Sequence, residues 1–280
     1  MVVAFAFLAA ACETAGESDS RARSTPPSSS QLRIGDSESF TPATHKERGK
    51  VVMPVTFPDG STAEIVYPPD TDIAAMGAQP YSSGQLSDCC ARDFFVLYGG
   101  VPKSELAGEA PLKIYRGFDG SPVEYWRSGS SGHDLMSDRW LIFNFHPWYV
   151  LVSDVEGSMT DQDLAGWARG LAAAQTRDGL VRLTASEPLQ LAKAGAHAGP
   201  ELLFSDGGQI VTFFVGACEP DPKEDGKVVP LGGKTGPEAE WFASRCFVDQ
   251  SMRMHVQSGD ETFARRVIGR VDVRNVQLAS

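Results

Sequence analysis

Apolar runs separated by turn-forming residues dominate the chain after residue 50. The runs 51–57 and 62–67 flank Pro-Asp-Gly at 58–60, where proline presets φ and glycine accepts a positive φ. This pattern predicts a β-hairpin. The runs 112–116 and 123–127 predict a second hairpin around a turn that contains Asp-Gly.

Two segments have the period of a helix rather than that of a strand. In the segment 160–174, Thr160 is placed to cap the N-terminus, and Leu164, Trp167 and Leu171 fall on one face. The second segment, 260–270, follows a capping box at 258–261 and places an apolar stripe on one side. The sequence therefore predicts two amphipathic helices, each between apolar strands.

The order of these elements predicts an α+β fold of antiparallel sheets, each with a helix packed on one face. It also suggests a duplicated β-β-β-α-β unit, although a chance similarity of two generic α+β segments explains the order nearly as well. We expect a first α+β unit at 50–194, which includes the N-terminal hairpin, and a second at 195–280. The predicted units comprise 112–116, 123–127, 149–153, helix 160–174 and 180–184, and then 201–204, 209–217, 247–256, helix 260–270 and 271–276.

Charge and hydropathy exclude two classes of protein. The chain has 25 Lys and Arg against 36 Asp and Glu, a formal net charge of −11, and no stretch concentrates basic residues. Nucleic acid is therefore not an expected partner, since binding it requires clustered cations that neutralise phosphates. The unbroken apolar run at the start ends at Cys12, short of the ~20 residues that span a bilayer. A polytopic membrane protein is thereby excluded.

The first twelve residues carry a resemblance to a known class. Residues 1–11 read MVVAFAFLAAA and are followed directly by Cys12. This segment resembles the signal of bacterial lipoprotein precursors, and the Ala/Gly/Asp/Arg-leaning composition resembles that of actinobacteria. The resemblance implies a signal or lipobox segment at 1–12 and a lipid on Cys12. Residues 13–49 are rich in Ser and Pro with little to bury, which predicts a disordered tether.

The other four cysteines form an even set if Cys12 carries a lipid. Cys218 and Cys246 flank a loop rich in Gly and Pro, and a disulfide between them would clamp the neck of that loop. Cys89 and Cys90 would then form a vicinal disulfide or stay thiols, or each would instead reach across to Cys218 and Cys246. Four reduced, buried cysteines are expected if the protein is cytosolic.

Candidate chemistry is sparse. The polar loop 129–134 offers His133 and Asp134, but its glycines and serines lack the spacing of a nucleophile elbow. His146 and Trp148 are candidates for a ligand pocket with aromatic walls from Tyr125, Trp126 and Trp140. The more economical reading of these aromatic residues is a sheet core.

Four carboxylates, Asp154, Glu156, Asp161 and Asp163, lie close together in sequence around a predicted strand end and helix start. A divalent cation would suit such a group, but strand-end polarity and acids favoured by the helix dipole explain each residue separately. We therefore assign no catalytic residue, no metal and no cofactor from the sequence.

These observations favour a surface-tethered lipoprotein on the outer face of the cell membrane. Its body would be a non-catalytic binding or structural module whose partner is an envelope protein or a small ligand. A secreted hydrolase using His133 and Asp134 is one alternative. A cytosolic protein with reduced thiols is another.

Overall fold

The computed structural model describes residues 39–86, 89–101, 106–129, 139–154, 157–196, 199–206, 208–223, 225–231 and 239–280. Antiparallel strands make up most of this part of the chain, together with two α-helices, α1 (Asp161–Gly170) and α2 (Glu261–Arg270). Neither described helix has the length and apolar character needed to cross a membrane. The predicted antiparallel sheets are present, but the fold is dominated by strands more strongly than an even α+β mixture would be.

One large sheet of thirteen strands runs through the molecule. Its main path, from one edge to the other, is β16-β17-β18-β15-β14-β4-β5-β10-β9-β8-β6, with β13 paired to β4 and β7 paired to β8. The bounds are β4 (Ala78–Leu86), β5 (Cys89–Tyr98), β6 (Leu106–Ala107), β7 (Lys113–Arg116), β8 (Pro122–Ser128), β9 (Arg139–Phe145), β10 (Trp148–Asp154), β13 (Leu189–Leu191), β14 (Glu201–Ser205), β15 (Gln209–Val215), β16 (Val228–Pro230), β17 (Trp241–Phe247) and β18 (Met252–Ser258).

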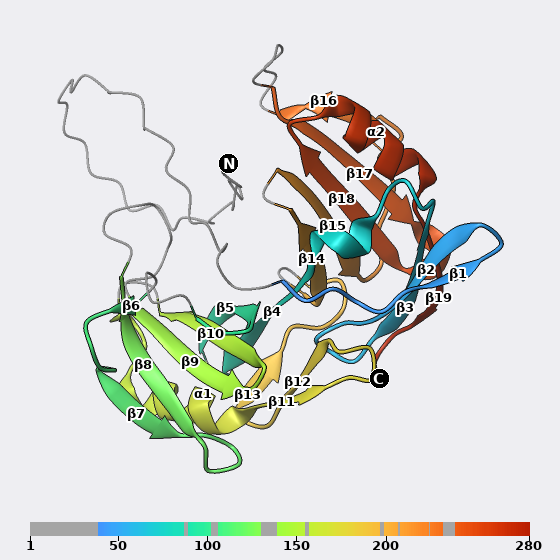
Figure 1. Cartoon of the computed structure of the whole chain (residues 1–280). Helices are drawn as coiled ribbons and strands as arrows, with labels where there is room; N and C mark the ends of the chain where they lie inside the picture. Colours follow the sequence, from blue (N-terminus) through green and yellow to red (C-terminus); the bar gives the residue numbers. More distant parts are fainter. Residues whose placement is uncertain are drawn as a thin grey trace, which may run out of the picture.

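Strand β4 joins the two halves of this sheet. One edge of β4 pairs with β5, whereas its other edge pairs first with β14, through Ala78–Tyr81, and then with β13, through Gly84–Leu86. The sheet therefore divides at β4 into a half with β5 to β10 and a half with β14 to β18. Figure 1 shows these halves at the lower left and the upper right of the molecule.

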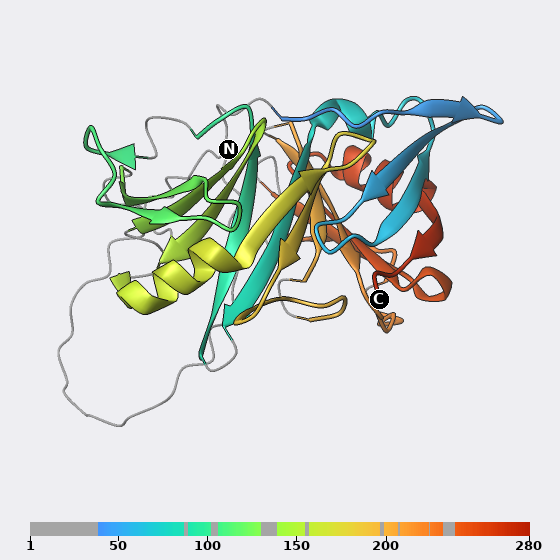
Figure 2. The ribbon, with the colours of Figure 1, turned by 90° about the horizontal axis from the view of Figure 1, so that it is seen from below.

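Both helices pack on the same face of the large sheet. Along β4, Ala78 belongs to the core beneath α2 and Leu86 to the core beneath α1, and an even spacing of residues in a strand keeps both side chains on one face. We call the core beneath α1 the first core and the core beneath α2 the second core. The first core contains Trp167 of α1 and residues of a small hairpin, which is formed by β11 (Leu171–Gln175) and β12 (Val181–Ala185). Figure 2, seen from below, shows α1 and β11 in front of the strands of the large sheet.

A separate four-stranded sheet covers the second core. It is formed by β1 (His45–Glu47), β2 (Lys50–Thr56), β3 (Thr62–Tyr67) and β19 (Asp272–Gln277). A short 3-10 helix, η1 (Ile73–Met76), follows β3 in the chain. The predicted 51–57/62–67 hairpin is thus present as β2 and β3. Strand β3 pairs with β19 from the end of the chain, and the hairpin shares a core with α2.

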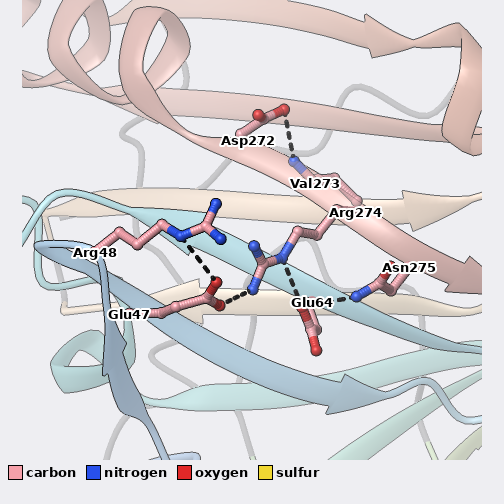
Figure 3. Close-up of polar contacts among 7 residues, drawn as sticks. All are labelled: Glu47, Arg48, Glu64, Asp272, Val273, Arg274 and Asn275. Carbon is pink, nitrogen blue, oxygen red and sulfur yellow. Dashed lines mark hydrogen bonds and ion pairs between the residues drawn. The ribbon is translucent and has the colours of Figure 1, made fainter.

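Ion pairs reinforce the contact between these distant segments. The Arg274 guanidinium on β19 donates to Glu64 of β3 at 2.7 Å and also to Glu47 of β1, and Asn275 donates to Glu64 at 3.0 Å (Figure 3). These hydrogen bonds hold the pKa of Glu47 below its ordinary value. Since the side chains remain partly exposed, the network serves to fix the register of the strands more than to add stability.

Helix α1 begins as predicted but ends earlier. Thr160 and Asp163 form a reciprocal capping box at its start. The predicted helix 160–174 is wrong after residue 170, because the Ala-rich segment that follows is strand β11. A Cβ on Gly170 would lie 2.8 Å from Leu189 and 3.2 Å from the Ser186 carbonyl oxygen, so close packing at this glycine overrides the helix propensity of the alanines.

The suggested duplication is not reproduced in the order of the strands. In the first half, β8, β9 and β10 are neighbours in chain order, whereas in the second half β18 lies between β15 and β17. In both halves the strand after the helix leaves the large sheet, β11 for its hairpin with β12 and β19 for the four-stranded sheet. The two halves share element types but not one topology.

The predicted disulfide between Cys218 and Cys246 is present, with a Cα–Cα distance of 5.9 Å. Cys90 is a free, half-buried thiol, so neither the vicinal disulfide nor the pairing of Cys90 with a distant cysteine occurs. The disulfide ties the start of the loop after β15 to strand β17.

Candidate functional site

The face of the large sheet opposite to both helices is the candidate site, and we call it the helix-free face. Directly paired residues of neighbouring antiparallel strands project to the same side. The pairs Tyr81 with Phe95 and Glu201 with Tyr81 therefore lie on one face, and they alternate with core residues of the helix-covered side. Neither described helix and neither small sheet packs on this face, because their apolar side chains all belong to the two cores on the other side.

In the first half of the sheet, the helix-free face is apolar and aromatic. Trp126 of β8 is paired directly with Trp140 of β9, and the Phe95 ring meets the Trp140 ring edge to face at 6.0 Å. Phe95 also contacts Tyr81 edge to face at 5.3 Å. The full cluster contains Phe95, Leu97, Val101, Leu106, Trp126, Trp140, Ile142, Tyr149 and Leu151. It forms a third apolar cluster, separate from both cores.

Acidic groups adjoin this cluster where the two halves of the sheet meet. Glu201 is 8% exposed, and burial, assisted by the nearby Asp93 carboxylate, raises its pKa to about 8. Burial also raises the pKa of Tyr81, and the Asp93 carboxylate beside its hydroxyl adds to the effect. A carboxyl group in such surroundings holds its proton near neutral pH.

Two buried polar groups on this face have no partner within the described residues. The Trp140 indole N–H donates no hydrogen bond, although the residue is only 6% exposed. The Tyr81 hydroxyl, which is also buried, likewise has no hydrogen-bond partner there. Native proteins pair nearly all such groups, so each unpaired one is an exception.

In the second half, the helix-free face carries a histidine between aromatic rings. The His255 ring lies 4.5 Å from the Phe214 ring and 5.3 Å from the Phe242 ring, measured between centroids. Burial, together with the positive charge of Arg253, lowers the pKa of His255 to about 4. This imidazole is therefore neutral near pH 7 and belongs to the aromatic lining.

Of the predicted pocket residues, His146 and Trp148 lie in the described part of the chain and differ in their surroundings. Trp148 is 1% exposed in the first core, where its indole N–H donates to the Gly179 carbonyl at 3.2 Å. His146 is exposed at the turn between β9 and β10. His133 and Asp134 lie outside the described residues, so the hydrolase alternative stays a hypothesis.

The three aromatic residues predicted to line the pocket lie on opposite faces of the sheet. Trp126 and Trp140 lie on the helix-free face, whereas Tyr125 lies in the first core and donates to Asp154. Alternation along β8 separates Tyr125 from Trp126.

The predicted group of carboxylates is dispersed among separate partners. Asp154 is fully buried and accepts from the Met159 N–H at 2.9 Å, a bond that links the end of β10 to the residue before the N-cap of α1. Asp161 accepts from Tyr115 at 2.7 Å and pairs with Lys113, and Asp163 caps α1. Glu156 lies outside the described residues. Among those described, no three His, Cys, Asp or Glu side chains are placed to hold a metal ion.

A small cavity of about 260 Å³ lies on the helix-covered side, between η1, the β14–β15 turn and α2. Thr71, Asp72, Asp206, Phe263 and Arg266 contribute to its lining. The cavity is small and its lining mixes both charge signs, so the helix-free face is the better candidate for a binding site.

Sequence reasoning missed the acidic part of the site. Tyr81, Asp93 and Glu201 are far apart in the chain, and only the pairing of β14, β4 and β5 brings them together. The one signal was a glutamate at the start of an apolar strand, at Glu201.

Comparisons with known proteins leave the family open. No family model and no curated protein matches the sequence. Two similar solved structures are the complex of Pseudomonas aeruginosa MucA and MucB (12% identity, 83% of this chain and 92% of that chain, TM-score 0.21) and MucB in complex with MucA(peri) (12% identity, 83% and 91%, TM-score 0.20). A likeness at these TM-scores supports no conclusion about the fold or the function.

Proposed function

We propose that the protein is a non-catalytic binding module of the cell envelope, held on the outer face of the cell membrane by a lipid on Cys12. The observation that carries the proposal is the helix-free face. It gathers three half-buried aromatic side chains, Phe95, Trp126 and Tyr149, on a surface that no described helix or small sheet covers. Partly exposed aromatic side chains gathered in this way are typical of binding sites.

The compartment is supported by two independent features. The Cys218–Cys246 disulfide suits an oxidising environment, because cytosolic thiols are kept reduced. The resemblance of residues 1–12 to a lipoprotein signal implies the anchor, and one lipidated cysteine with more than one acyl chain gives stable attachment. Together they support a module that is presented outside the cytoplasm.

Binding of Nile red, a neutral apolar dye, tests whether the helix-free face is an accessible binding surface. We expect the folded protein to increase Nile red fluorescence, and the Trp126→Ser, Tyr149→Ser double variant to lose most of that increase. The matched control is Ile114→Ser with Phe118→Ser, which removes apolar side chains 59% and 63% exposed on the β7 hairpin. Equal dye binding by the face variant and the wild type, with circular dichroism unchanged, would contradict the proposal.

A further inference from the structure

The cavity of about 260 Å³ between η1, the β14–β15 turn and α2 is a second place where a ligand can be held. It lies on the helix-covered side of the large sheet, apart from the helix-free face. Its lining includes two buried apolar side chains, Met76 and Phe263, which are 6% and 3% exposed. The volume is below that of pockets for drug-sized ligands, so it suits a small metabolite.

One side of the cavity carries an arginine that has no ion pair among the described residues. Arg266 of α2 forms no hydrogen bond there either, and its buried Nε has no partner. The other arginines of α2 differ, because Arg265 pairs with Glu261 and Arg270 pairs with Asp70 at 2.8 Å. Arg270 is also the main cause of the lowered pKa of Asp70, to which Arg266 adds the smallest contribution. The Arg266 guanidinium therefore keeps donor positions for a ligand.

Two carboxylates that line the same cavity have no cationic partner in the described chain. Asp72 is the N-cap residue of η1, but its side chain makes no capping hydrogen bond. Asp206 accepts through Oδ1 from the N–H groups of Gly208 and Gln209, at 3.2 and 3.0 Å, which leaves its second oxygen for another donor. Neither carboxylate forms an ion pair with Arg266, so opposite charges border one space without meeting each other.

A buried hydroxyl adds to this polar lining. Thr71 is 6% exposed, and its Oγ1 has no hydrogen-bond partner within the described residues. A hydroxyl both donates and accepts, so it is compatible with either a carboxylate or an ammonium group. A ligand that matches the whole lining combines a carboxylate, which suits the planar fork of a guanidinium, with ammonium groups for the two aspartates.

We propose that this cavity binds a free basic α-amino acid. Its carboxylate pairs with Arg266, its two ammonium groups pair with Asp72 and Asp206, and its aliphatic stem packs against Met76 and Phe263. The charges balance, since one negative and two positive groups of the ligand meet one guanidinium and two carboxylates of the lining. The site is separate from the helix-free face, so the inference does not depend on the binding function proposed for that face.

Three small molecules that differ by one charge test the proposal with the full chain. L-Lysine carries the carboxylate and both ammonium groups, cadaverine lacks the carboxylate, and L-norleucine lacks the side-chain ammonium group. Isothermal titration calorimetry at pH 7 measures the affinity of each. We expect lysine to bind about tenfold more tightly than either of the others, because each lost charge-assisted hydrogen bond corresponds to about that factor.

Each cavity variant should remove one of these two preferences. Arg266→Gln lacks the guanidinium, so its affinities for lysine and cadaverine should agree to within about twofold. The double variant Asp72→Asn, Asp206→Asn lacks both carboxylates but keeps the Oδ1 acceptor at position 206. Its affinities for lysine and norleucine should likewise agree to within about twofold.

Matched controls remove the same charges from exposed positions. Arg265→Gln lies on the same helix as Arg266, and the double variant Glu219→Gln, Asp249→Asn lies away from the cavity lining. Both should keep the two preferences of the wild type. Each preference is a ratio of affinities measured on one folded protein, so a moderate loss of stability does not alter it. The wild-type comparison needs no variant and stays decisive if one fails to fold.

The assignment would be overturned if the wild type did not bind lysine, if it bound lysine no better than cadaverine or norleucine, or if the cavity variants kept both preferences. None of these results bears on Nile red binding, which reports on the helix-free face. The two proposals can therefore fail separately.

Discussion

Glu201 is the residue whose environment most clearly departs from that of an ordinary surface carboxylate. Its folded pKa of about 8 lies above the ordinary value of 4.5, because burial and the neighbouring Asp93 disfavour ionisation. The folded state therefore keeps a proton that the unfolded chain releases above pH 4.5. The contribution of Glu201 to folding is most favourable below pH 4.5 and declines as the pH rises towards 8.

Glu201→Gln should therefore stabilise the protein increasingly as the pH rises. The amide stays neutral, so the melting temperature of the variant minus that of the wild type should grow between pH 4.5 and 8, and level off above. Even one unit of raised pKa corresponds to about 1.4 kcal/mol, or about 3 °C or more in a protein of this size. Thermal unfolding at pH 5 and at pH 8.5 measures the difference, with Glu219→Gln as the exposed control. A difference that does not change with pH would show that Glu201 ionises normally.

At the scale of elements, local signals were sufficient for the hairpins and the helix starts. Turn residues at 58–60 and the cap at Thr160 act within a few residues, so the sequence alone reveals them. Strand β4 was not predicted, because its sequence AQPYSSGQL has no apolar alternation. Its buried Ser82, Ser83 and Gly84 fit only because the neighbouring strands approach closely: a Cβ on Gly84 would lie 2.4 Å from Phe94.

Because β4 was not predicted, the arrangement of the two halves of the large sheet was not predicted either. Without the strand that joins the halves, the shared helix-free face and the meeting of Tyr81, Asp93 and Glu201 were not foreseeable. The aromatic walls at Trp126 and Trp140 were predicted as residues, but the face on which they lie depends on the long-range pairing of the sheet.

The Cys218–Cys246 disulfide should contribute measurably to stability. Its residues are 28 positions apart, and loss of loop-closure entropy in the unfolded chain gives about 3.6 kcal/mol as an upper guide. We expect Cys218→Ala with Cys246→Ala to lower the free energy of unfolding in urea by about 2–4 kcal/mol. The free-thiol control, Cys90→Ala, should have a much smaller effect. Equal stability of the wild type with and without a reducing agent would contradict this role.

At the scale of the whole molecule, one large sheet has both of its helices and both small sheets on the same side. The opposite side is left with an aromatic cluster, a buried acid and an unpaired indole N–H. The placement of the four-stranded sheet brings the start and the end of the described chain together on the helix-covered side, away from this face. We infer that the molecule is built to present the helix-free face to a partner outside the cytoplasm.

The intact mass of the protein from its native host, taken with and without reduction before alkylation, tests the envelope assignment most directly. The account predicts a chain that begins at Cys12 and carries added acyl mass, with two further cysteines alkylated only after reduction. A full-length, unlipidated chain whose five cysteines are all alkylated without reduction would contradict it.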